Sequence, residues 1–566
     1  MANMADMQSE ILIGTPRFAG SSQPAPAAGS DAPKLAAPGL AATWRATLAQ
    51  DLPGALAGVG GAFAVALRGP GDRVTLAVDR FAIHSLCYRI DGGRLRVAER
   101  ADSLAADGAA LDPQALHDYL YFHAIPSPRT AYRGVFRLPP GHFAVFEAGQ
   151  LTVAPYWVPR FDDAGQGRSF NDLRDTFRRL LREAVAGQLD GSKPACYLSG
   201  GTDSSTVAGM IREASGQRAA SYSIGFDADG YDEMAYARLA AKHFDTEHHE
   251  YYVTPDDLVR SIPEVAASYD QPFGNSSALP AYYCARMAQA DGVRKILAGD
   301  GGDELFGGNT RYAKQRVFNW YASVPAGLRS GLVEPLAGAV RGLPLVRKAA
   351  SYIEQARQPM PARLASYNLL LRLGRERVLT AGFRRQLNPE LVATEQAAVW
   401  AAAHTGSLLN RQLAFDWRYT LAENDLPKVC GTSRLAGLDV GFPMLDTALL
   451  DFSTTLPASY KLRALKLRWF FKEALRGFLP DEILTKKKQG FGLPFGVWML
   501  RHDGLRQLAR DCLATLAPRG IIEPSFVREL LDQRLAEHPG YYGEMVWILM
   551  MLEQWLRVHA PDYRVD

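Results

Sequence analysis

The strongest constraint on the fold lies at residues 195–214, where an apolar run, a glycine turn and a helical sequence follow one another. Ala195 to Leu198 is typical of a short buried strand, and Ser204 to Ala214 has the composition of a helix. A strand that turns through glycines into a helix directs backbone N–H groups and partial positive charge at the turn, which suits a phosphate. The turn is not a Walker loop, since no Lys follows the glycines. Asp203 adds a carboxylate where a Mg²⁺ ion bridging phosphates would need an oxygen ligand.

Strand-like and helix-like segments alternate through the next hundred residues. The predicted strands cover residues 219–226, 248–253 and 295–298, and the predicted helices cover residues 232–244, 255–267 and 282–290. Such alternation is typical of a parallel sheet with helices on both faces. Ligands of these sheets bind at the carboxyl ends of the strands, where Ser199 lies.

A second glycine-rich turn, Ala298 to Gly308, follows the last of these predicted strands. It carries three acidic residues within five positions, Asp300, Asp303 and Glu304. A single loop of this kind is usually an Asp/Gly-rich surface loop. Two such loops at matching strand ends favour a metal–phosphate site.

A lysine-rich segment, Thr485 to Gly492, is a third candidate. A run of lysines is usually solvated, but the flanking glycines could place one ammonium group over a polyphosphate or a developing oxyanion. The run His248-His249-Glu250 invites a metal interpretation. Because adjacent residues on a strand face opposite sides, we predict a structural role for it.

The length of 566 residues is too great for one hydrophobic core and favours about three domains. Residues 1–40 are rich in Ala, Pro, Gly and Ser and are predicted to form a flexible leader. Residues 41–165 carry short strand-like runs between turns and are predicted to form a small layered domain. Residues 166–566 are predicted to form the phosphate-binding domain, in which residues 320–400 are helical and carry no chemistry that we can name.

The bulk composition excludes several classes of protein. A net charge of +3 gives no reason to expect a nucleic-acid or membrane partner. The five scattered cysteines have no CxxC spacing, which argues against structural zinc or a disulfide framework and fits a reducing cytoplasm. We expect no signal peptide, because no basic region precedes an apolar run, and no membrane span, because no stretch of 18 apolar residues occurs.

Taken together, these segments resemble the asparagine synthetase family over roughly residues 58–560. The family's SGGxDSS pyrophosphate loop corresponds to Ser199–Ser205, and its SGxGxDE loop to Ala298–Glu304 with Ala and Asp at the first and third positions. Residues 269–273 and 486–492 also resemble family signatures. The resemblance implies an α/β fold: an N-terminal truncated Ntn-hydrolase-like α+β layered domain, followed by a Rossmann-like parallel-sheet ATP-pyrophosphatase domain with many helices.

The resemblance also implies a reaction and its site residues. A carboxylate would attack the α-phosphate of ATP to give an acyl-adenylate and pyrophosphate, and an amine would then displace AMP. Asp203 and Asp303 would bind Mg²⁺, Lys488 would stabilise the pentavalent phosphorus or the later tetrahedral centre, and Asp300 stands where the family has a Glu needed to form the intermediate. The pyrophosphate would be held by Ser199, Gly200, Gly201, Asp203, Ser204 and Ser205, and the nucleotide would be lined by Leu198, Ile224, Ala298 and Gly299.

One departure from the family concerns the nitrogen source. Full members begin Met-Cys and use that Cys to hydrolyse glutamine, whereas this sequence begins Met1-Ala2-Asn3 and its first cysteine is Cys87. The segments at 79–81, 133–135 and 138–141 resemble only the later half of the glutaminase domain. We therefore expect a degenerate amidotransferase-like domain that does not hydrolyse glutamine.

A second departure concerns the acceptor. Many relatives read K-V-D-R where this chain has Lys428-Val429-Cys430-Gly431, and later carry an Arg where it has Gly441. If those basic groups fix aspartate, the carboxylate substrate is a different one.

Three functions remain open. The first is an amide-forming ligase that joins a small-molecule or peptide carboxylate to ammonia or another amine. The second is a cyclase, either the macrolactam-forming kind of lasso-peptide pathways or a β-lactam synthetase. The third is a pseudoenzyme scaffold, against which Asp203, Asp303 and Lys488 argue. A homodimer, or a separate protein that supplies the amine or the substrate, is also left open.

Overall fold

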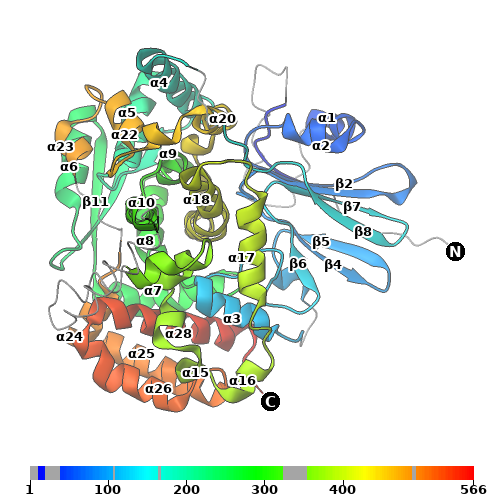
Figure 1. Ribbon diagram of the computed structural model, residues 1–566, viewed down its shortest axis with the longest axis vertical. Coiled ribbons are helices and arrows are strands. Elements are labelled where there is room, and N and C mark those ends of the chain that lie inside the picture. The colour runs from blue at the N-terminus through cyan, green and yellow to red at the C-terminus, as the bar shows by residue number, and fades with distance from the viewer. Residues whose placement is uncertain are drawn as a thin grey trace.

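The computed structural model describes residues 10–18, 38–105, 109–162, 167–322, 325, 353–486 and 492–565. Figure 1 shows the strands of the N-terminal part on one side of the molecule and a larger helical part, built around a second sheet, on the other. Within the described residues, no helix is long and apolar enough to cross a membrane. The mixed α/β class predicted from the sequence is confirmed.

The N-terminal part contains two antiparallel sheets. The five-stranded sheet has the order β1-β2-β3-β7-β8, and the three-stranded sheet has the order β5-β4-β6. The elements are β1 (Ile11–Gly14), α1 (Pro38–Leu48), α2 (Leu52–Ala57), β2 (Phe63–Arg68), β3 (Val74–Val78), β4 (Cys87–Asp91), β5 (Arg94–Ala98), α3 (Pro113–Phe122), β6 (Val135–Arg137), β7 (His142–Glu147) and β8 (Gln150–Pro155).

Part of the predicted leader belongs to this sheet. Strand β1 pairs antiparallel with β2, with Ile11 opposite Ala66 and Gly14 opposite Phe63. The apolar residues 11–13 therefore form an edge strand of the sheet, although the predicted leader that contains them is rich in Ala, Pro, Gly and Ser. The rest of the predicted leader lies mostly outside the described residues.

The second sheet is fully parallel and has the order β11-β10-β9-β12-β13. Its strands are β9 (Ala195–Tyr197), β10 (Ala220–Phe226), β11 (Glu247–Val253), β12 (Lys295–Leu297) and β13 (Asp439–Gly441). The chain fills one side of β9 first, with β10 and β11, and then moves to the other side with β12 and β13. The strand order therefore reverses between β9 and β12, which is the point where ligands bind in open α/β sheets.

Helices cover both faces of the parallel sheet, and its central strands β9, β10 and β12 are largely buried between them. Neighbouring residues of β9 and β12 enter opposite cores: Ala195 and Ile296 face one, and Cys196 and Leu297 the other. One face packs against α7 (Pro255–Ser268), α8 (Ala278–Ala290), α24 (Phe495–Arg501), α25 (Asp503–Leu516) and α28 (Pro539–His559). The other face packs against α4 (Phe170–Ala186), α5 (Thr202–Ser215), α6 (Met234–Phe244), α9 (Gly302–Phe306), α20 (Thr447–Thr455) and α22 (Trp469–Ala474).

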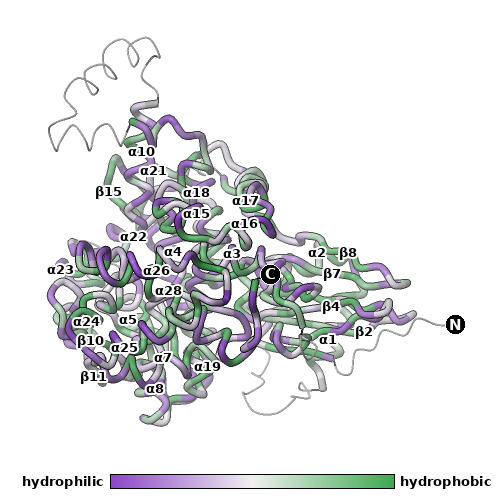
Figure 2. Tube along the Cα trace, turned by 90° about the horizontal axis from the view of Figure 1, so that it is seen from below, coloured by the Kyte–Doolittle hydropathy of each residue, from purple (hydrophilic) through white to green (hydrophobic). Residues whose placement is uncertain are grey.

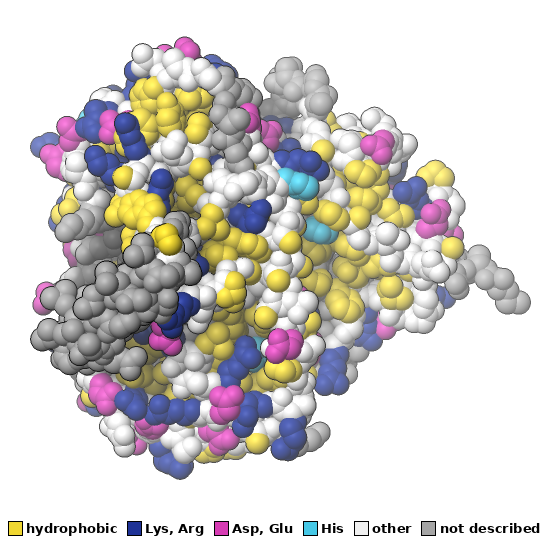
Figure 3. Space-filling view, viewed as in Figure 1, with side chains coloured by type: hydrophobic (Ala, Val, Ile, Leu, Met, Phe, Trp, Pro, Cys, Tyr) yellow, Lys and Arg dark blue, Asp and Glu magenta, His cyan; other side chains and the backbone are white. Residues whose placement is uncertain are grey.

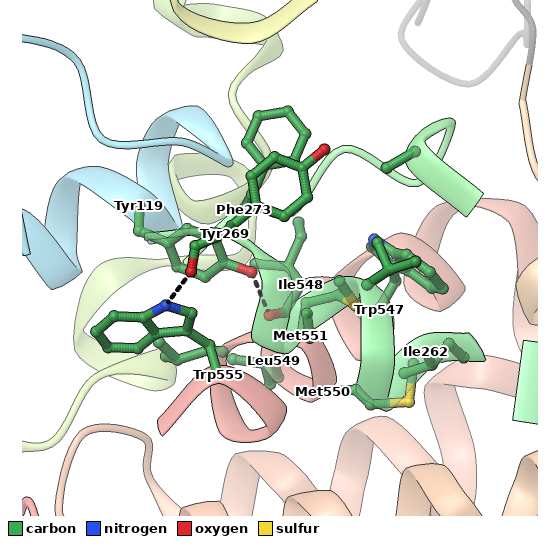
Figure 4. Packing of buried hydrophobic residues seen from close by; sticks show 14 of the residues in the cluster. Tyr119, Ile262, Tyr269, Phe273, Trp547, Ile548, Leu549, Met550, Met551 and Trp555 are labelled. Carbon is green, nitrogen blue, oxygen red and sulfur yellow. Dashed lines mark hydrogen bonds between the residues drawn. The ribbon is translucent and has the colours of Figure 1, made fainter. Parts of the chain in front are cut away.

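Helix α28 is buried along most of its length, as its nearly uniform apolar sequence predicts. Figure 4 shows Trp555 beside Tyr119 and Tyr269, which come from other elements of the same buried cluster. Its polar groups are satisfied across the core: the Tyr119 hydroxyl donates to the Ile548 carbonyl at 2.7 Å, and Trp555 Nε1 donates to the Tyr269 carbonyl at 3.1 Å. The Tyr119 bond joins the N-terminal part to the parallel-sheet part, and the Trp555 bond fastens α28 to the residue that follows α7.

Glu544 on α28 should make stability depend on pH. Burial raises the pKa of this carboxyl from 4.5 to about 7, although a hydrogen bond from Ser276 lowers it. The folded state therefore holds the proton more tightly than the unfolded state, and stability is lost as pH rises from about 4.5 to 7. In wild type the free energy of unfolding should fall by up to about 1.4 kcal/mol per pH unit in that window, and in Glu544→Gln this fall should be absent. The measurement is urea unfolding at a series of pH values.

The exposed Glu376 provides the matched control for this prediction. It lies on the surface helix α15 (Arg375–Val378), so Glu376→Gln should leave the pH dependence as in the wild type. If the unfolding free energies of wild type and Glu544→Gln changed with pH in the same way, Glu544 would not be the source of this pH dependence.

Ion pairs from the N-terminal part to α20 and to the residue before it hold the N-terminal part against the parallel-sheet part. Arg17 pairs with Asp446, and Arg80 Nη1 lies 3.0 Å from Asp451 Oδ1. Asp79 fixes the turn that contains Arg80 by accepting backbone N–H bonds, including one from Phe81 at 2.9 Å. Seen at right angles in Figure 2, the strands of the N-terminal part project from the helical body. The Asp79–Arg80 motif thus has a structural role at this junction.

The region 320–400 is mostly helical where the structure describes it. It contains the end of α10 (Thr310–Ala322), then α14 (Leu369–Leu373), α15, α16 (Ala381–Arg385) and α17 (Leu391–Ala402). Residues 326–352 lie outside the described residues. On the face shown in Figure 3, basic and acidic side chains are interspersed, as expected for a chain with little net charge.

Candidate active site

Two loops lie at the point where the parallel sheet reverses its strand order. One joins β9 to α5, and the other joins β12 to α9. The strands pair directly, with Cys196 opposite Leu297, so both loops leave the same edge of the sheet side by side. The sequence predicted both loops at strand ends, and the topology makes them neighbours.

The first loop is shaped by hydrogen bonds within residues 199–205. The Ser199 N–H donates to Ser204 Oγ at 3.1 Å, and the two hydroxyl oxygens lie 3.0 Å apart. Gly200 has φ +71, and a Cβ there would lie 2.4 Å from the Ala237 nitrogen, so only glycine fits. The Ser205 hydroxyl is buried and has no hydrogen-bond partner. The loop therefore holds polar groups, one of them unsatisfied, at the N-terminus of a 14-residue helix.

The residues predicted to line the nucleotide lie around these loops. Leu198 and Ala298 are buried at the ends of β9 and β12. Ile224 is on β10, two residues beyond Tyr222, which pairs with Tyr197. Ile224 thus lies level with the first loop on the neighbouring strand.

The two loops touch through glycines. A Cβ on Gly299 would lie 2.7 Å from the Ser204 nitrogen, and one on Gly302 would lie 2.1 Å from Asp203 Oδ1. Real Cβ contacts are longer than this, so the approach depends on the missing side chains. Glycine at both positions brings the two carboxylate-bearing loops into contact.

Gly299→Ala should therefore separate the loops. Its nearest neighbours are backbone atoms of Ser204 and Asp203, which cannot rotate away. We expect a loss of about 1–3 kcal/mol in unfolding free energy, the usual cost of overpacking, measured by urea denaturation. Gly39→Ala makes the same change in open space and should not destabilise the protein. Equal stability of both variants would show that the loops tolerate separation.

Asp203 and Asp303 converge on one side chain, Arg468. Arg468 Nη1 lies 2.8 Å from Asp203 Oδ2 and 2.8 Å from Asp303 Oδ1, and it also donates to Thr202 Oγ1 at 2.8 Å. Arg468 Nη2 makes a further short contact with Asp203. The two carboxylates predicted to bind a cation thus meet at one positive group. Mg²⁺ prefers oxygen ligands, and two carboxylates that meet at one point offer such ligands.

Asp300 faces a second cation on the same edge. Lys428 Nζ lies 3.4 Å from Asp300 Oδ1 and 3.5 Å from Asp425 Oδ1. Burial lowers the pKa of Lys428, but the two carboxylates outweigh burial and raise it overall. A charged lysine thus lies beside the loop that carries Asp300, on helix α19 (Leu426–Leu435).

Of the predicted site residues, Lys488 lies outside the described residues. The preceding Lys486 is described: its Nζ lies 2.8 Å from Glu233 Oε1 and 4.3 Å from the centre of the Tyr236 ring. Residues 236 and 237 pack against Gly200. The start of the lysine-rich segment is therefore fastened beside the first loop.

Sequence reasoning missed Arg468 altogether. It belongs to the basic run 461–468, which resembles a solvated charge run, yet its side chain is only 5% exposed. No glycine or acidic pattern marks it. Its contacts are 165 and 265 residues away along the chain, and only the fold reveals them.

The two glycines of the altered acceptor segment occupy crowded positions. A Cβ on Gly431 would lie 2.5 Å from a ring carbon of Tyr269, and one on Gly441 would lie 2.3 Å from Gln188 Oε1. Gly431 also lines a cavity at the junction of the two parts, together with Tyr269, Asp270, Cys430 and Arg434. Neighbouring side chains therefore occupy the space beside both glycines.

Comparisons with known proteins show similarity over most of the chain. The model of the asparagine synthase family matches residues 176–557, and that of the glutamine amidotransferase domain matches residues 52–157. Asparagine synthetase [glutamine-hydrolyzing] 1 of Bacillus subtilis (strain 168) is 23% identical over 507 residues, covering 88% of this chain and 77% of that protein. Asparagine synthetase [glutamine-hydrolyzing] 3 of the same strain is 23% identical over 519 residues (87% and 77%). Amidase chyE of Penicillium rubens is 25% identical over 491 residues (77% and 70%).

Proposed function

The chain belongs to the asparagine synthase family of ATP-dependent carbon–nitrogen ligases, and we propose that it adenylates a carboxylate and transfers the acyl group to an amine. The observation that carries this proposal is the contact between two loops at the strand-order reversal of the parallel sheet. One loop offers hydroxyls and N–H groups at a helix N-terminus, and the other offers carboxylates.

The first loop would hold the phosphates of ATP. Ser199, Ser204 and Ser205 present hydroxyls there, and Gly200 and Gly201 allow the phosphate to approach the backbone. The unsatisfied Ser205 hydroxyl supports this role, because a buried hydroxyl without a partner is costly unless a ligand completes it. Leu198, Ile224, Ala298 and Gly299 would border the nucleotide.

Asp203 and Asp303 would hold Mg²⁺. Both carboxylates already converge on a cationic group, and an all-oxygen donor set suits this ion. When bound, Mg²⁺ would neutralise charge that accumulates on the leaving pyrophosphate. Asp203 and Asp303 would orient the phosphate chain so that the α-phosphorus faces the incoming carboxylate.

Lys488 and Asp300 would act at the reacting centre. The Lys488 ammonium would stabilise the negative charge that develops as the carboxylate attacks phosphorus and again as the amine attacks the acyl carbon. Asp300 lies on the second loop, where its ion pair with Lys428 holds it at the sheet edge. Asp300 would help to orient the carboxylate for formation of the acyl-adenylate.

We infer that the nitrogen donor is ammonia or another amine. Glutamine hydrolysis by a cysteine requires an accessible thiolate. Burial raises the pKa of all five thiols in this sequence. None of these five cysteines suits that chemistry.

Glycine at 431 and 441, where many relatives carry basic residues, favours an acceptor other than aspartate. This observation keeps a cyclase of the macrolactam or β-lactam type as the second candidate. In a cyclase, the amine would belong to the same molecule as the activated carboxylate.

The test is pyrophosphate release from ATP and Mg²⁺ with a panel of carboxylates, each assayed with ammonia, with glutamine and without an added amine. Release that depends on a carboxylate, with AMP as coproduct, would support the ligase. Turnover without an added amine would support the cyclase. The proposal would be overturned if the protein released no pyrophosphate and bound no ATP under all of these conditions.

A further inference from the structure

Arg468 contacts both of the proposed metal ligands, Asp203 and Asp303. One atom, Nη1, is 2.8 Å from both Asp203 and Asp303, and Nη2 also contacts Asp203. The guanidinium therefore takes the place between the carboxylates that a divalent cation would take.

Arg468 is built firmly into this position. Its backbone lies in the left-handed region with φ +53, and its N–H donates to the carbonyl of Gly307, which caps the C-terminus of α9, at 3.2 Å. Its guanidinium carbon lies 3.9 Å from the centre of the Phe471 ring. With a side chain that is 5% exposed, Arg468 cannot swing into solvent without uncovering this packing.

A divalent cation and Arg468 would compete for the same oxygens. A metal bound to Asp203 and Asp303 would lie next to a buried positive charge, and like charges repel strongly where water is excluded. The negative oxygens of a polyphosphate would relieve this repulsion, because they can pair with both cations. Binding of the metal should therefore depend on binding of the nucleotide.

We propose that Arg468 is a positioning residue that keeps the two carboxylates together and excludes a free divalent cation, so that the metal enters only with the nucleotide. The proposal rests on the proposed function, in which Asp203 and Asp303 are the metal ligands. Arg468 thereby sets the order in which the nucleotide and the divalent cation bind.

The test is Mn²⁺ binding to the full-length protein, followed by electron paramagnetic resonance without any turnover. Without nucleotide, wild type should bind Mn²⁺ weakly, and Arg468→Gln should bind it at least tenfold more tightly. Adding ATP without a carboxylate should tighten Mn²⁺ binding to wild type by a larger factor than to Arg468→Gln. Arg476→Gln, on the surface shortly after α22, removes an exposed guanidinium and should behave as wild type.

The outcomes separate this inference from the proposed function. If nucleotide-free wild type binds Mn²⁺ as tightly as Arg468→Gln, the exclusion by Arg468 is refuted while the metal ligands stand. If neither protein binds Mn²⁺ with or without ATP, the metal assignment itself fails. Thermal unfolding checks that Arg468→Gln is folded. If it is not, Arg468→Lys, which keeps one charge but cannot bridge both carboxylates with a planar fork, should bind Mn²⁺ more tightly than wild type.

Discussion

Asp203→Asn is expected to lower the rate of pyrophosphate release by about 10²–10³-fold, the range seen when one preorganised electrostatic contact is lost. The change keeps the shape of the side chain and removes its charge. Asp203 is placed both to ligate Mg²⁺ and to pair with Arg468, so its neutral form would leave a buried cation undercompensated. The measurement is the rate of pyrophosphate release at saturating ATP.

The control for Asp203→Asn is Asp229→Asn. Asp229 is exposed on the loop after β10, at the same edge of the sheet, and should tolerate the change. Thermal unfolding of each variant separates loss of chemistry from loss of fold, because Asp303 still pairs with Arg468 in Asp203→Asn. Turnover at the wild-type rate in Asp203→Asn would refute the assignment of this carboxylate as a metal ligand.

Lys488→Gln is expected to have an effect of similar size, on the order of 3–4 kcal/mol in the activation free energy. The proposed role is to stabilise charge that exists only in the transition state, so the rate constant should fall while ATP binding is kept. Single-turnover formation of AMP, measured together with the dissociation constant of ATP, tests this separation.

The neighbouring lysines provide the comparison for Lys488→Gln. Lys487→Gln changes the same charge one residue away and should keep most activity. Lys486→Gln removes the ion pair to Glu233 beside the first loop and should have an intermediate effect. If Lys487→Gln lost as much activity as Lys488→Gln, the catalytic charge would have been assigned to the wrong residue of the triplet.

Local sequence signals predicted the elements that carry the candidate site. The predicted helix at 204–214 is observed as Thr202–Ser215, and the predicted strand at 295–298 as Lys295–Leu297. Apolar runs, glycine turns and helical composition act within about twenty residues, so each could be interpreted without knowing the rest of the chain. The same local signals predicted the buried helix α28.

The leader illustrates where composition misleads. Residues 11–14 lie in a segment of leader-like composition but pair with β2. Pairing of an edge strand depends on a partner some fifty residues away, which average composition does not report. The domain boundaries at 40 and 165 stay predictions.

By itself the sequence determined the parallel-sheet class, the two glycine-rich turns and the residue types that could hold phosphate and metal, because these follow from local periodicity and turn chemistry. Only the tertiary structure decided that β9 and β12 are neighbours, that Gly299 and Gly302 let their loops touch, and that Arg468 joins Asp203 to Asp303. The physical reason is that strand order and buried ion pairs depend on contacts between segments more than a hundred residues apart, and no local pattern records these contacts.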